Sequence, residues 1–158
     1  KEGKTLVLTR GRSPQDYYYA LRQQRTAVIH HEWIEGEPGE KARFPTVLLY
    51  ANGDTGQSGV PMGSVISSAG VHTLHVEVSG APAGSPVVLI GSGAGQSLPI
   101  PLGNTDGSGK LQSVYTVMMP ASGEEWYFVV ACAADELACG SNQNHRAVTA
   151  PIWFTSGS

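Results

Sequence analysis

The chain has 158 residues, enough for one domain with a sizeable core or for one domain and an appended piece. Its formal net charge of -3 gives no basic excess, which argues against a nucleic-acid partner. No apolar run approaches the roughly 18 residues of a membrane span, so no membrane partner is expected. The 20 glycines and 10 prolines predict many turns, as an all-β domain requires.

The N-terminal residues predict a strand followed by a capped helix. The run Thr5–Thr9 is short and apolar, with the composition of one strand. Ser13 is a natural helix N-cap, Pro14 suits the first helical position, and Asp16 completes a capping box with Asp in place of Glu. The helix should therefore begin at Pro14 and run for about three turns.

One face of this helix is predicted to be buried, because Tyr17, Ala20 and Leu21 recur at helical spacing. Strand composition returns at Thr26–Ile29. A strand, a helix and a second strand within about 30 residues make a βαβ unit, which predicts parallel strands. No second such unit follows. A chain that starts directly on a strand leads us to expect an upstream segment.

Residues 35–45 are charged and broken by Pro and Gly, which indicates a linker between residues 1–34 and a β-domain over 46–158. Strands are predicted at Thr46–Ala51, Val60–Ile66, His72–Val78, Pro86–Ile90, Lys110–Met119, Glu125–Cys132 and Ala147–Thr155. The two long strands on either side of residues 120–124 are expected to form the core hairpin. This number of short strands is typical of an immunoglobulin-like β-sandwich, here with an N-terminal strand-helix-strand element.

Two cysteines, Cys132 and Cys139, are separated by six residues of loop-like sequence. A local disulfide is predicted, which would place the protein in an oxidising compartment, either periplasmic or secreted. The alternative is a pair of free thiols.

Residues with chemistry are few. His30, His31 and Glu32 are candidate metal ligands, but adjacent histidines on a strand point to opposite sides, so a structural role at a strand end is the alternative. The scattered histidines His72, His75 and His145 are expected at the surface. No catalytic or cofactor-binding residue is predicted.

The segment GNTDGSGK places Asn104, Asp106 and Ser108 at alternate positions, as in oxygen-rich calcium loops. The spacing that would end in Glu is missing, so a polar hairpin turn is the competing interpretation.

The sequence TLVLTR followed by S-P-x-x-x-x-x-A-L-R-x-x-R-T-A-V resembles the last strand and helix of metal-dependent hydrolases of the polymerase-and-histidinol-phosphatase (PHP) type. The likeness covers residues 4–34, extends loosely over GVPMGS and the next strand at residues 59–78, and includes the C-terminal APIWF. In the branch of the family with a trailing β-domain, a segment like ALRxxRT closes the barrel.

The resemblance implies a non-catalytic C-terminal accessory domain of a larger phosphoesterase, whose partner is the upstream PHP-like barrel. The parent enzyme would use a divalent metal, Zn, Mn or Fe, to activate water. The family's ligands lie on earlier strands, so no catalytic residue is carried over and this chain needs no cofactor. The helix face, exposed without the barrel, could also mediate a homo-oligomer.

A second hypothesis is a stand-alone secreted module that binds a carbohydrate or a protein. Its candidate surfaces are the odd-numbered face of His72–Val78 and the aromatic segment Trp126–Phe128. A structural adaptor is a third. The apolar face of the helix discriminates the first two, because burial against the sandwich favours the stand-alone module and exposure favours the piece of a larger enzyme.

Overall fold

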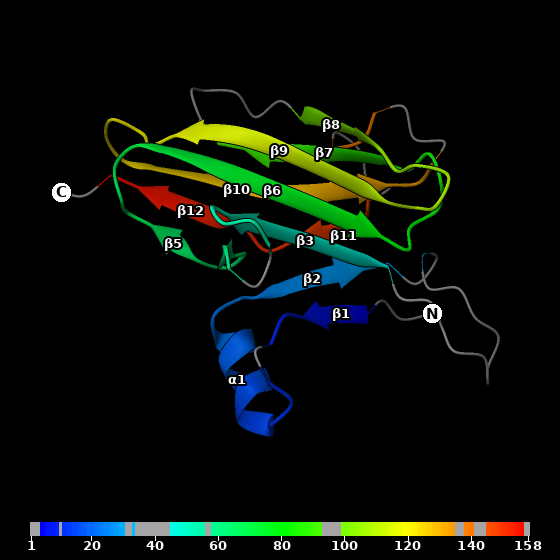
Figure 1. The fold of residues 1–158 in the computed structure, drawn as a ribbon, viewed down its shortest axis with the longest axis horizontal. Helices are drawn as coiled ribbons and strands as arrows, with labels where there is room; N and C mark the ends of the chain where they lie inside the picture. The colour runs from blue at the N-terminus through cyan, green and yellow to red at the C-terminus, as the bar shows by residue number, and fades with distance from the viewer. Residues whose placement is uncertain are drawn as a thin grey trace.

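The computed structural model describes residues 4–9, 11–30, 33, 45–55, 58–92, 99–134, 138–140 and 145–156. It is mainly β, with two packed sheets and an N-terminal strand-helix-strand element, which is the predicted fold class (Figure 1). The elements in chain order are β1 (Lys4–Val7), α1 (Pro14–Arg22), β2 (Thr26–Ile29), β3 (Thr46–Ala51), β4 (Val60–Pro61), β5 (Val65–Ile66), β6 (Val71–Ser79), β7 (Pro86–Gly91), β8 (Ile100–Asn104), β9 (Leu111–Met118), β10 (Glu124–Cys132), β11 (His145–Thr149) and β12 (Ile152–Thr155).

The larger sheet has the order β1-β2-β11-β10-β12-β5, with β7 also paired to β10 and β8 to β7. The smaller sheet has the order β4-β3-β6-β9. Antiparallel pairing prevails, and β5 with β12 is the parallel pair in the described part of the chain. β6 and β10 are the long central strands of the two layers (Figure 1).

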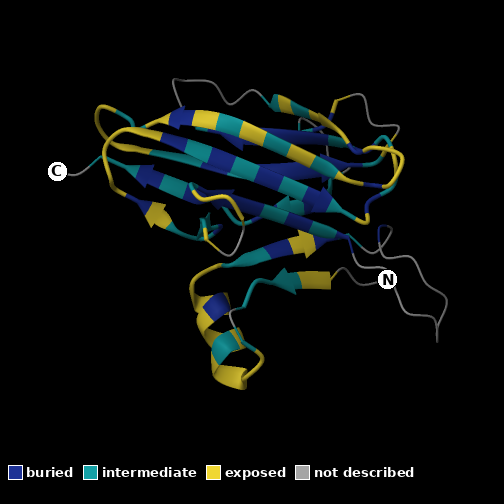
Figure 2. Ribbon diagram, viewed as in Figure 1, coloured by how far each residue is buried: buried dark blue, intermediate teal, exposed yellow. Residues whose placement is uncertain are grey.

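The core lies between the two sheets and follows from period-two alternation on the strands that face each other. On β6, Leu74 and Val76 point inward and are buried, while His75 between them is half-buried. On β10, Tyr127 and Val129 face the same core. The alternating burial along the long strands is visible as dark blue and teal bands (Figure 2).

The predicted hairpin of the two long strands is wrong. β9 pairs with β6 in the smaller sheet, whereas β10 pairs with β7, β11 and β12 in the larger one. The connection through Pro120 and Gly123, the latter at φ 82°, therefore crosses from one layer to the other. On β10, Trp126 and Phe128 lie on the side opposite Tyr127, as alternation along a strand requires.

The predicted final strand is divided into β11 and β12 by Ala150 and Pro151. Both pieces run antiparallel to β10, with Val148 opposite Val130 and Ile152 opposite Tyr127. The pairing register therefore shifts by one residue at the interruption, as expected where proline removes a ladder donor.

The predicted parallel βαβ unit is also corrected, because β1 and β2 are antiparallel, with Leu6 opposite Ala27. The helix lies beyond the ends of these strands rather than across a sheet face (Figure 1). The chain reverses after α1 at Gln24, which has φ 53°, and Leu8 N donates to Arg25 O at 2.9 Å. β2 thus returns beside β1 without a crossover.

The strand β2 is joined to the sandwich. It pairs with β11, and its Ala27 and Ile29 belong to the main core. At Gly63 a Cβ would lie 2.1 Å from Gln23 O, so the turn between β4 and β5 needs glycine to approach the end of α1. Of the predicted linker, Pro45 is described and the rest lies outside the described residues, so the division at 35–45 stays a prediction.

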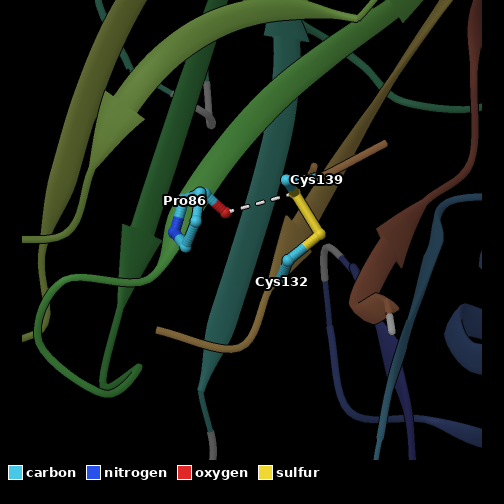
Figure 3. The surroundings of a disulfide bond; sticks show 3 residues. All are labelled: Pro86, Cys132 and Cys139. Carbon is cyan, nitrogen blue, oxygen red and sulfur yellow. Dashed lines mark hydrogen bonds between the residues drawn. A yellow bond between two sulfur atoms is a disulfide. The ribbon is translucent and has the colours of Figure 1, made fainter. Parts of the chain in front are cut away.

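A disulfide joins Cys132, at the end of β10, to Cys139, with a Cα–Cα distance of 5.7 Å (Figure 3). The predicted bridge is confirmed. Cys139 Sγ lies 3.6 Å from the carbonyl oxygen of Pro86, where β7 begins. The bridge belongs to a second apolar cluster on the outer face of the larger sheet, formed with Val88, Ile90, Val130 and, partly buried, Trp126, Phe128 and Val148.

Candidate functional site

The N-terminal helix is built as the sequence predicts. Ser13 Oγ accepts from Asp16 N at 3.2 Å, and Asp16 Oδ2 accepts from Ser13 N at 2.9 Å, which completes the capping box. The hydrogen bond from the Ser13 hydroxyl, followed by the one from its backbone N–H, lowers the pKa of the Asp16 carboxyl. The cap is therefore strongest when Asp16 is ionised.

The predicted burial of the helix face is wrong for Tyr17 and Leu21, which are 45% and 52% exposed. Of the nine helical residues, all of them described, only Ala20 is buried. Tyr18 and Tyr19 are exposed as well, at 63% and 55%. The helix projects from the sandwich, and its surface is mostly exposed (Figure 2). The apolar side chains of Tyr17 and Leu21 are thus not buried against the sandwich.

Cations lie near two of these rings. The Arg22 guanidinium lies 6.0 Å from the centroid of Tyr18, and that of Arg25 lies 5.2 Å from the centroid of Tyr19. Cation–π attraction of this kind stabilises both pairs. The exposed surface of α1 thus carries three tyrosines and the side chains of Leu21 and Arg22.

An apolar cavity adjoins the same unit. It has a volume of about 370 Å³ and is lined by Lys4, Thr5, Leu6, Ile29 and Pro45. It lies where β1 and β2 extend the larger sheet. The N-terminal unit therefore has two open surfaces, that of the helix and this apolar cavity.

A polar groove runs on the outer face of the smaller sheet, along β6. Two cavities of about 600 and 240 Å³ make it up, and both are lined by Glu77 and Gln112. The other lining residues are Thr46, Leu48, Val78, Ser79, Asp106, Lys110 and Leu111 in the larger cavity and Tyr50, Asp54, His75, Val76, Ser113 and Val114 in the smaller.

Tyr50 lies at the floor of this groove and contacts Glu77 and His75. Its hydroxyl donates to Glu77 Oε1 at 2.6 Å, and its ring stacks on His75 with centroids 5.0 Å apart and planes 3° apart. Burial, then the hydrogen bond and charge of Glu77, raises the pKa of Tyr50 to about 12. The residues are 27 positions apart, so no sequence motif marks the pair, although the polar odd-numbered face of β6 was predicted as a binding surface.

The predicted surface positions of His72 and His75 have different outcomes. His75 is half-buried under its contact with Tyr50, but His72 is buried at 5% exposure, so a surface position is wrong for His72. His72 Nε2 donates to Ser68 O at 2.8 Å, and Nδ1 lies 3.0 Å from the Asn52 amide nitrogen. His72 shares the parity of the inward-facing residues of β6, which explains its burial.

Of the three candidate metal ligands, the structure describes His30. His30 N donates to Arg146 O at 2.6 Å, which continues the ladder of β2 and β11. His31 and Glu32 lie outside the described residues. No group of three or more His, Cys, Asp or Glu side chains able to hold a metal occurs among the residues described. His145 begins β11 and is half-buried.

The segment GNTDGSGK, whose spacing is similar to that of calcium loops, forms a polar turn. Asp106 Oδ1 accepts from Ser108 N at 2.8 Å, from Ser108 Oγ at 2.7 Å and from Lys110 N at 3.0 Å. These bonds, led by that from the Lys110 backbone, lower the pKa of Asp106. The Asp106 carboxylate therefore stabilises the turn that connects β8 and β9.

No helix in the described ranges is long and apolar enough to cross a membrane. A scan against protein-family models finds no match to the chain, and searches of curated proteins and of solved structures find none either.

Proposed function

We propose that this chain is the non-catalytic accessory domain of a larger PHP-like metal-dependent hydrolase, and that α1 and β1 dock it against the catalytic barrel of that enzyme. The observation that carries the proposal is the exposed surface of α1, where Tyr17, Tyr18, Tyr19 and Leu21 are each 45% to 63% exposed.

The helix needs a partner on energetic grounds. Isolated helices shorter than about 12–15 residues are marginal in water, and α1 has nine residues with one buried side chain. Covering half of the exposed area of four large side chains would contribute several kcal/mol, at about 25 cal/mol per Å² of apolar surface. The capping box alone contributes about 1 kcal/mol.

The character of the face fits a second protein domain. Tyrosine and arginine are enriched at protein interfaces, and the exposed Arg22 adds a positive charge to the helix surface. The complementary surface would be apolar with acidic groups at its rim. The resemblance of TLVLTR and the following helix to the end of a PHP barrel is our reason for proposing that barrel as the partner. The catalytic metal, which would activate water when bound, would then be held by the barrel.

The disulfide supports an oxidising compartment, so we place the parent enzyme in the periplasm or outside the cell.

The first test is the size of the native polypeptide, detected in extracts of the source cells with an antibody against this chain. We expect a band several times larger than 16.6 kDa. That polypeptide should hydrolyse bis(p-nitrophenyl) phosphate with added Mn²⁺ and lose the activity to a chelator. In it, the amides of α1 should exchange with deuterium more slowly than in the 158-residue chain, because docking buries the helix.

A single band at the size of this chain would contradict the proposal. A dimer of that small polypeptide, dissociated by Leu21→Asp but not by the matched Gln15→Asp on the same helix, would assign the face to a homo-oligomer instead.

A further inference from the structure

The groove along β6 lies on the smaller sheet, whereas α1 and β1 adjoin the larger one. Its lining is mainly polar. We propose that it binds a short, neutral oligosaccharide through Glu77 and Gln112. This inference is independent of the docking of α1.

The position of β6 determines how a ligand could be recognised. β6 is hydrogen-bonded to β3 on one side and to β9 on the other, so an extended peptide cannot add to it as a strand. Any ligand in the groove must be recognised by side chains. Residues 75–79 span about 13 Å at about 3.3 Å per residue, which gives an elongated site.

Two facing side chains have unused hydrogen-bonding capacity. Glu77 is directly opposite Gln112 in the register of β6 and β9. The Tyr50 hydroxyl fixes Glu77 through Oε1, and Oε2 has no hydrogen bond to any residue in the described part of the chain. The exposed Gln112 amide likewise makes no bond among these residues. A carboxylate accepts and an amide both donates and accepts, which matches hydroxyl groups that do both.

The charges of the groove select against anionic ligands. Glu77, Asp54 and Asp106 line it together with a single cation, Lys110. A phosphate, sulfate or uronate would therefore meet net repulsion. Val114, opposite His75 in the register of β6 and β9, is 59% exposed and adds an apolar margin on which the C–H face of a sugar can pack. A neutral polyhydroxylated ligand fits all of these groups.

The test is a nuclear magnetic resonance titration of the isotope-labelled 158-residue chain with cellotriose, laminaritriose, maltotriose and chitotriose. Concentrations reach about 10 mM, well above a Kd of about 1 mM. We expect saturable shifts of backbone signals at Leu48, Glu77 and Gln112 with at least one trisaccharide. Gln112→Ala should weaken its binding at least about fivefold. The control Thr116→Ala, exposed on the same face of β9, should leave the Kd unchanged.

Absence of saturable shifts with all four trisaccharides would overturn the proposal. So would shifts centred on Trp126 and Trp153, on the outer face of the other sheet, or binding that Gln112→Ala does not weaken. None of these results bears on the size of the native polypeptide or on α1, so the two proposals fail separately.

Discussion

Tyr50 shows how one residue can face outward and still be buried. Its side chain lies on the outer face of β3, yet it is 3% exposed because His75 stacks on the ring and the turn at Gly59 packs against it. At Gly59 an added Cβ would lie 2.5 Å from Tyr50 Cδ2. The hydroxyl is left with Glu77 as its partner, so an ionised Tyr50 would be desolvated beside a negative charge.

Replacing Tyr50 with phenylalanine should remove this interaction and its pH dependence. A hydrogen bond to a carboxylate is worth about 1.5 kcal/mol, so Tyr50→Phe should lower the free energy of unfolding by about that amount at neutral pH. The folded pKa is raised from 10.0 to about 12, so the stability advantage of the native tyrosine is complete below pH 10 and is lost as pH rises through 12. Urea unfolding of both proteins from neutral to alkaline pH measures this.

Tyr18→Phe, on exposed helix surface, is the matched control and should leave the stability almost unchanged. A difference between wild type and Tyr50→Phe that stays constant up to pH 12 would contradict the assignment of the raised pKa.

Single positions were predictable where alternation decides them. The inward positions Leu74 and Val76 follow directly from period two, and the same parity places His72 inside, against the expectation that histidine lies at the surface. The contact of Tyr50 with Glu77 was not predictable, because strand register and the fold of the turn at Gly59 create it.

At the scale of elements, α1 depends on its cap more than a packed helix would. Only Ala20 is buried, so tertiary packing contributes little and the Ser13–Asp16 box contributes a large part of its stability. Ser13→Ala should destabilise the helix by about 1 kcal/mol, which raises hydrogen exchange of the α1 amides about fivefold. The thermal midpoint of the whole chain should hardly change.

Gln15→Ala, on the same helix but outside the box, is the control and should not accelerate exchange in α1. If Ser13→Ala leaves exchange unchanged, or lowers the midpoint of the whole chain substantially, then the helix is held by packing rather than by its cap.

The type of each element was easier to predict than its partner. The capping box located the start of α1 at Pro14, and alternation located β6 and β10. Alternation is the same whether a strand pairs with its neighbour in sequence or with a strand of the other layer, which is why β9 and β10 were wrongly paired. Likewise, a strand-helix-strand pattern does not reveal whether the second strand returns parallel or antiparallel.

For the molecule as a whole, the larger sheet is apolar on both faces. One face forms the core of the sandwich, and the other carries the cluster that includes Val88, Ile90 and Val130, all buried. The turn at Cys139 and Gly140 covers this outer cluster, because a Cβ at Gly140 would lie 2.9 Å from Ile90 Cδ1. The disulfide to Cys132 holds the turn to the end of β10.

Removing the disulfide should therefore destabilise the whole sandwich and uncover the outer cluster. The bridge joins cysteines seven positions apart, and closing so short a loop contributes about 2–2.5 kcal/mol. For a chain of 158 residues, this lowers the thermal midpoint by roughly 5–10 °C in Cys132→Ala/Cys139→Ala. Calorimetry measures the midpoint, and binding of an apolar dye measures exposure of Val88 and Ile90. Wild type reduced with dithiothreitol should match the double variant. A variant with an unchanged midpoint and no dye binding would show that the turn covers the cluster without the covalent bond.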